Sequence, residues 1–72
     1  MIKFLELNDY ETSVFNNADR FTLWSKNFKK EFKTFEDIQD YENDDDFITN
    51  KKYLVYAIQN NSQACIATME NK

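Results

Sequence analysis

The chain has 72 residues, with no Gly, no Pro and no His, and it carries 9 basic against 13 acidic side chains, a formal net charge of −4. Without Gly there is no glycine-rich phosphate loop, and without His there is no His-based acid–base catalysis and little scope for zinc or iron sites. We therefore expect a single domain over residues 1–72 that is not an enzyme and that holds no cofactor or metal.

The composition also bears on the cellular compartment. Cys65 is the single cysteine, so a disulfide within the chain is excluded and a reducing compartment fits. The first residues, MIKFLELNDY, do not resemble a signal peptide. No apolar run approaches the roughly 18 residues of a transmembrane helix. We expect a soluble, cytoplasmic protein with no membrane contact, in which Cys65 is a buried and inert thiol.

The N-terminal part predicts a strand followed by a short helix. Residues 1–7 form a short, mostly apolar run of the kind found in strands. Asn8 is followed three residues later by Glu11, which is the capping-box arrangement that begins many helices. The pattern predicts a helix from Asp9 to about Phe15.

The next segment has the clearest periodicity of the chain. Aromatic residues recur at steps of three and four, which predicts an amphipathic helix that Asn17 caps and that ends near Lys33. The apolar stripe of this helix consists of Phe21, Trp24, Phe28, Phe32 and Phe35. We expect the stripe to lie in the core. Leu23 lies off the stripe and is expected to be exposed.

A third helix and two strands complete the prediction. Thr34 with Asp37 is a second capping signal, so a helix is expected from Phe35 until it frays before residue 44. Residues 51–59 and 64–69 are rich in β-branched and aromatic side chains, which is typical of strands.

The two C-terminal strands are expected to form a hairpin. Asn60 and Asn61 are able to adopt the positive φ values of a two-residue loop. This loop pairs Tyr56 with Cys65 and Val55 with Ile66. The first of the two strands is apolar on both faces and is expected to be central. The fold class is then α+β, a small domain in the order β-α-α-α-β-β with a three-stranded antiparallel sheet and helices on one face.

The acidic segment EDIQDYENDDD, residues 36–46, is the main functional signal. It contains seven carboxylates: Glu36, Asp37, Asp40, Glu42, Asp44, Asp45 and Asp46. Carboxylates four residues apart on a helix lie about 6 Å from each other, a spacing of the order found between phosphates of a nucleic-acid strand. We predict that these seven residues bind a partner protein with a basic DNA-binding surface. The alternative is a solvated helix end.

The charged residues also suggest two other ligands, calcium and nucleic acid. Asp40, Glu42 and Asp44 have the spacing of the first ligands of an EF-hand loop, but Asp45 stands where that loop requires Gly, and Lys51 where it requires Glu, so no calcium site is expected. The basic residues of the expected second helix suggest weak nucleic-acid binding through Lys26, Lys29, Lys30 and Lys33. The aromatic residues between these lysines face inward on that helix, and the net charge is negative, so direct nucleic-acid binding is not expected.

In its overall character, and above all in EDIQDYENDDD, the chain resembles the small acidic host-takeover and counter-defence inhibitors of bacteriophages, of the DNA-mimic type. The resemblance implies an inhibitor of a DNA-binding protein in the cytoplasm of a host cell. The DNA polymerase sliding clamp, whose block stops DNA replication, is the first candidate target, and nucleases, CRISPR effectors and RNA polymerase are the others. No peptide motif for clamp binding follows any Gln, so the positively charged channel of the clamp is the expected site.

A different class of function stays open beside this one. The chain fits a structural or regulatory subunit that associates through an apolar surface, for example a homodimer formed along an exposed edge strand at Ala64–Met69.

Overall fold

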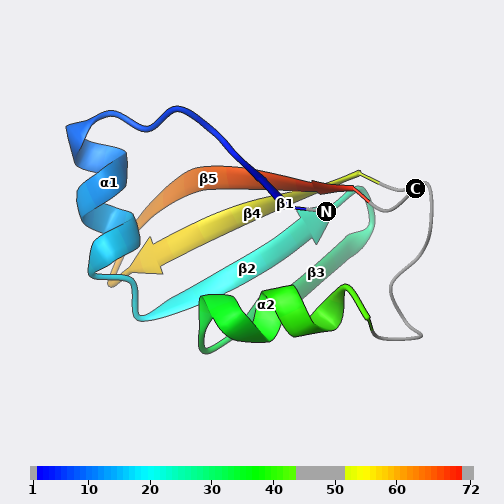
Figure 1. The fold of residues 1–72 in the computed structure, drawn as a ribbon. Coiled ribbons are helices and arrows are strands. Elements are labelled where there is room, and N and C mark those ends of the chain that lie inside the picture. Colours follow the sequence, from blue (N-terminus) through cyan, green and yellow to red (C-terminus); the bar gives the residue numbers. More distant parts are fainter. Residues whose placement is uncertain (1, 44–51, 71–72) are drawn as a thin grey trace.

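The structure, a computed structural model, describes residues 2–43 and 52–70. Their elements are β1 (Ile2–Phe4), α1 (Asp9–Asn16), β2 (Arg20–Ser25), β3 (Phe28–Phe32), α2 (Phe35–Tyr41), β4 (Lys52–Gln59) and β5 (Ser62–Glu70). The strands form one antiparallel sheet in the order β1-β5-β4-β2-β3, and α1 and α2 pack on the same face of it (Figure 1). The predicted three-stranded sheet with three helices is therefore wrong.

The main difference is the segment predicted as the second helix, which is the β2–β3 hairpin. Its loop is Lys26–Asn27, and Asn27 takes a φ of 66°. Across the hairpin Phe21 pairs with Phe32. Leu23 is fully buried (0% exposed), whereas it was expected on the surface. Trp24 points to the other face of the sheet and is 43% exposed.

Two of the three predicted helix starts are confirmed; the third, at Asn17, is wrong, because Asn17 ends α1 and the segment after it forms β2. In α1 the Glu11 backbone N–H donates to Asn8 Oδ1 at 2.8 Å, and the Asn8 backbone N–H donates to Glu11 Oε1 at 2.9 Å. In α2 the Asp37 backbone N–H donates to Thr34 Oγ1 at 3.1 Å. These bonds satisfy backbone donors that have no partner within the helix.

The β4–β5 hairpin has the predicted loop, Asn60–Asn61, with Asn60 at a φ of 53°. Tyr56 pairs with Cys65 as predicted, and β4 is central, between β5 and β2. Val55, however, pairs with Ala67, because a bulge shifts the register by one residue between Val55 and Tyr56. An extra residue in one strand has no periodic signature in the sequence.

The edges of the sheet also differ from the prediction. β5 lies between β1 and β4, and Ile66 in the middle of Ala64–Met69 is fully buried. β1 pairs with Ala67–Met69, and the Leu5 N–H donates to the Ile66 carbonyl, so most of this segment does not offer a free edge for a homodimer. The strands at the two edges are β1 and β3.

The core lies between the sheet and the two helices. Val14 from α1 and Ile38 and Tyr41 from α2 join one buried cluster on this inner face of the sheet. The strands contribute alternate residues to the same cluster, except at the bulge, where the consecutive Ile66 and Ala67 both belong to it. The strand residues are Phe21, Leu23, Tyr53, Val55, Ala57, Ala64, Ile66, Ala67 and Met69. Of the helices in residues 2–43 and 52–70, neither has the length and apolar character needed to cross a membrane.

Candidate functional site

The predicted acidic site is described only in part. Glu36, Asp37 and Asp40 are exposed on α2, and Glu42 is half-buried at its C-terminal end. The other three carboxylates of the prediction, Asp44, Asp45 and Asp46, lie outside the described residues. Glu36 and Asp37 occupy the first turn of α2, where negative charge also complements the helix dipole.

One side of α2 has mixed charge. A hollow of about 380 Å³ between α2 and β3 is lined by Asp37 and Asp40 on the helix and by Lys30 and Lys33 opposite them. The Lys30 ammonium lies 5.8 Å from the centre of the Phe32 ring and 5.6 Å from that of Tyr41, within the range of cation–π attraction. Two of the described carboxylates thus have lysines across this hollow.

Taken together, the two helices form an acidic layer. They carry five carboxylates and no Lys or Arg: Asp9, Glu11, Glu36, Asp37 and Asp40. We call α1 and α2 with these side chains the acidic helical layer. Its charge is a consequence of the fold, because the acidic residues of α1 lie far from the 36–46 segment in the sequence.

An aromatic cluster lies between the two helices. The Phe4 ring centre is 5.3 Å from that of Phe35 and 6.0 Å from that of Phe15, and Phe15 and Phe35 are 5.8 Å apart. Phe21 lies beneath them and contacts both Phe15 and Phe35. We call Phe4, Phe15, Phe21 and Phe35 the aromatic opening. It is only partly covered, since Phe4 is 52% exposed.

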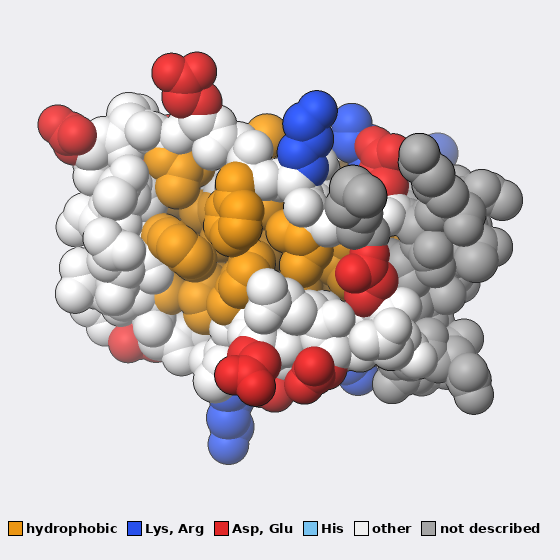
Figure 2. Space-filling model, viewed as in Figure 1, with side chains coloured by type: hydrophobic (Ala, Val, Ile, Leu, Met, Phe, Trp, Pro, Cys, Tyr) orange, Lys and Arg blue, Asp and Glu red, His pale blue; other side chains and the backbone are white. Residues whose placement is uncertain are grey.

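Figure 2 shows an apolar patch on this side of the molecule, with acidic side chains on the surfaces above and below it. Sequence reasoning did not find this surface. Phe4 and Phe15 come from two elements that were predicted as separate, and Phe21 and Phe35 were assigned to a helix stripe. Only the tertiary fold brings the four rings together.

The predicted basic cluster is not a single surface. Lys29 and Lys30 are successive residues of β3 and point to opposite faces of the sheet. Lys26 lies in the β2–β3 loop and Lys33 follows the end of β3. The four lysines would share one face only on the helix that the structure does not contain.

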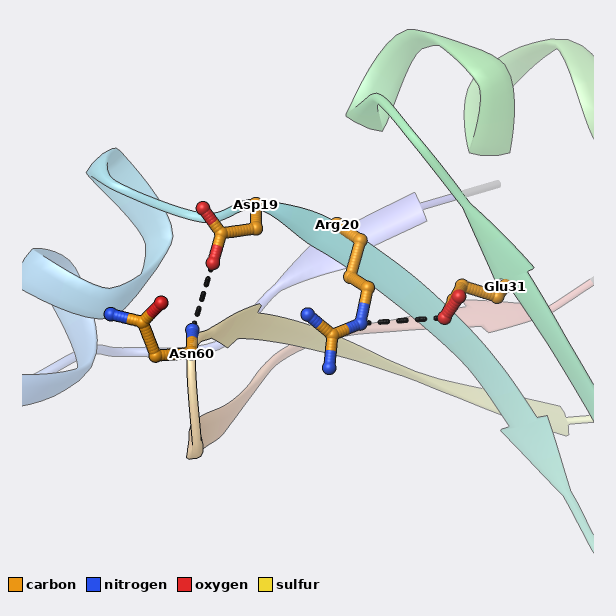
Figure 3. Close-up of polar contacts among 4 residues, drawn as sticks. All are labelled: Asp19, Arg20, Glu31 and Asn60. Atoms are coloured by element: carbon orange, nitrogen blue, oxygen red, sulfur yellow. Dashed lines mark hydrogen bonds and ion pairs between the residues drawn. The ribbon is translucent and has the colours of Figure 1, made fainter.

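Polar contacts at one end of the sheet have a structural role (Figure 3). The Asp19 carboxylate accepts a hydrogen bond of 2.8 Å from the Asn60 backbone N–H, and the Asp19 N–H donates to the Ile58 carbonyl at 2.8 Å. Arg20 Nε lies 3.3 Å from Glu31 Oε2 and joins β2 to β3. These contacts fix the β4–β5 loop and the edge hairpin.

Metal and thiol chemistry find little support in the described parts of the chain. Residues 2–43 and 52–70 contain no group of three His, Cys, Asp or Glu side chains suited to a metal ion. Of the three residues with the EF-hand spacing, Asp44 lies outside these ranges. Cys65, expected to be buried, is only half-buried. This partial burial is the main cause that raises the pKa of the Cys65 thiol, whose Sγ lies 3.9 Å from the Ala67 carbonyl oxygen, and a raised pKa makes the thiol less reactive.

No protein-family model, no curated protein and no solved structure matches this chain.

Proposed function

We propose that this protein is a small protein-binding inhibitor that uses its acidic helical layer to cover the basic, DNA-binding surface of a partner. The observation that carries the proposal is the aromatic opening between two helices that have carboxylates and no basic residue. Apolar surface within a polar border is characteristic of protein interaction sites. The negative charge selects a partner of positive charge.

The rings and the carboxylates have different tasks in this proposal. Phe4 is 52% exposed, so a partner that covers it removes roughly 100 Å² of apolar surface from water, worth about 2.5 kcal/mol. A stable interface needs about 800 Å² on each side, so the opening is the centre of a larger contact. The carboxylates around it act mainly on the rate and the specificity of association.

A DNA-binding protein is the partner that fits this charge. Such a protein carries Lys and Arg where it contacts phosphates, and the exposed carboxylates of α2 present negative charges to the same groups. Occupation of that surface blocks DNA from it. The sliding clamp stays the first candidate, followed by nucleases, CRISPR effectors and RNA polymerase.

The test begins with tagged protein as bait in a bacterial lysate and elution by a salt gradient. One bait variant carries Glu36→Gln and Asp40→Asn on α2. A charge control carries Glu31→Gln and Glu70→Gln, which change the net charge by the same amount in strand residues that pair with Arg20 and Lys52. We expect the original bait to retain a DNA-binding protein. This protein should elute from the α2 variant at a lower salt concentration, and from the control at the same salt concentration as from the original bait.

The second step uses the partner identified in this way. We expect the protein to displace labelled duplex DNA from it, and the Phe4→Ala variant to do so less well. If the partner binds DNA and this protein at the same time, it is not inhibited and the proposal is wrong. The proposal is also wrong if the partner elutes from the α2 variant and from the control at the same salt concentration.

A further inference from the structure

We propose that the face of the sheet opposite the helices binds single-stranded nucleic acid, with Trp24 as the stacking platform and Lys3 and Lys29 as the phosphate contacts. We call this surface the open face. The inference goes beyond the proposed function, because it concerns the other side of the sheet and a different class of ligand.

The strand register places the three residues in one row. Lys3 pairs with Thr68, Thr68 with Leu54, Leu54 with Trp24, and Trp24 with Lys29. The row crosses all five strands, with a lysine at each end. At about 4.8 Å per strand its ends lie about 19 Å apart, a length that suits about four to six nucleotides of a single strand.

Trp24 stands beside a hollow of about 230 Å³ on the open face. The hollow is lined by Thr22, Trp24, Lys29, Tyr56, Ile58 and Gln63. The indole is 43% exposed, so part of the ring is accessible to a base. Aromatic rings on a sheet with lysines nearby are the usual platform for unpaired bases, because every base has a face that stacks. The Gln63 amide and the Thr22 hydroxyl supply hydrogen-bonding groups in the same hollow.

The charge of the open face favours an anionic ligand. Alternation along the strands puts four basic and two acidic side chains on it: Lys3, Arg20, Lys29, Lys52, Glu31 and Glu70. Arg20 pairs with Glu31 at 3.3 Å, and Lys52 with Glu70 at 3.9 Å. Within residues 2–43 and 52–70, neither Lys3 nor Lys29 has an ion-pair partner. Two such faces from two copies of the chain would repel each other, whereas a phosphate backbone is attracted.

Trp24 is the single tryptophan of the chain, so its fluorescence reports directly on this site. The full chain is titrated with a single-stranded hexanucleotide at several salt concentrations. We expect quenching on binding, and an affinity that falls with salt with a log–log slope of about −1.4 for two phosphate contacts. Lys3→Gln and Lys29→Gln should each reduce the slope by about 0.7. The control Lys33→Gln lies off the open face and should leave it unchanged.

A second readout follows a labelled hexanucleotide by fluorescence anisotropy, with the fold of each variant checked by circular dichroism. Trp24→Leu should weaken binding at least about fivefold if the indole stacks on a base. The absence of quenching at low salt, or a slope that Lys29→Gln does not change, would overturn the inference. So would a dimer in sedimentation that Trp24→Leu dissociates, since a second copy would then be the ligand of the open face.

Discussion

Neighbouring substitutions at Leu23 and Trp24 test the two faces of β2. Leu23 is fully buried against the helices, whereas Trp24 is 43% exposed on the open face. Leu23→Lys loses about 3 kcal/mol of packing and also places an ammonium group where no water reaches it, at a cost of several kcal/mol more. A domain of 72 residues has a stability of about 4 to 11 kcal/mol in total. We therefore expect Leu23→Lys to be unfolded and Trp24→Lys to stay folded.

The milder Leu23→Ala variant allows the loss in the free energy of unfolding to be measured. A loss of about 3 kcal/mol lowers the melting temperature of a domain of this size by about 12 to 24 °C. The assay is thermal unfolding followed by far-ultraviolet circular dichroism, with Trp24→Ala as the comparison. The predicted amphipathic helix, capped by Asn17 and ending near Lys33, requires the reverse order, with Trp24 in the core and Leu23 on the surface. A folded Leu23→Lys protein, or a larger loss at Trp24 than at Leu23, would refute the sheet assignment.

Three further substitutions or conditions test local features. Asn60→Ala should destabilise by about 1 kcal/mol, and Asn60→Gly should not, because Asn60 has a φ of 53°; urea unfolding of both variants measures the difference. Asn8→Ala removes one half of the capping box and should cost about 1 kcal/mol, seen in the same assay, while an equal loss from Asn61→Ala would argue against a specific cap. Burial raises the pKa of Cys65 in the folded state above that of the unfolded thiol. The neutral thiol therefore contributes fully to the stability of the fold at neutral pH. This contribution is lost as the pH rises from the pKa of the unfolded thiol through that of the folded one. Alkylation should accordingly be slower in the folded protein than in urea, and equal rates would contradict this burial.

Short-range signals in the sequence correctly predict the starts of α1 and α2 and the loop between β4 and β5. The Asn8–Glu11 and Thr34–Asp37 pairs mark helix starts because a side chain and a backbone N–H three residues apart meet in only one local geometry. Asn60 likewise indicated a hairpin, because Asn tolerates a positive φ better than most residues. Each of these features depends on a few neighbouring residues and on no distant contact.

The β2–β3 hairpin shows where this approach failed. A step of four residues keeps a side chain on one face of a helix and also on one face of a strand, so Phe28 and Phe32 fit both. The step of three residues from Phe21 to Trp24 fits a helix and not a strand, so it favours the helix prediction. In the structure Trp24 lies on the other face of the sheet from Phe21. The turn at Lys26–Asn27 was not recognised, since Asn without Gly is a weaker hairpin signal.

The candidate sites were predictable to different degrees. The carboxylates of the acidic segment lie close together in the sequence, so the sequence alone predicts that they share one surface. The carboxylates on α2 are exposed, as expected for either a binding site or a solvated helix end. The aromatic opening depends on contacts between β1, α1, β2 and the start of α2, and the open-face row on the register of all five strands. Neither arises from any local pattern, because both are set by strand order.

The fold also changes the meaning of the net charge of −4. By sequence the negative charge is concentrated in residues 36–46, but in the structure both helices are acidic and the open face has an excess of basic groups. A helix layer lies about 10 Å from the sheet it covers, and at physiological salt the Debye length is about 8 Å, so each face is largely screened from the other. A cationic protein surface at the helices and a phosphate backbone at the sheet are therefore compatible on one small domain. At low salt the screening length exceeds the thickness of the domain, and the carboxylates of α1 and α2 then weaken the attraction of phosphate to Lys3 and Lys29.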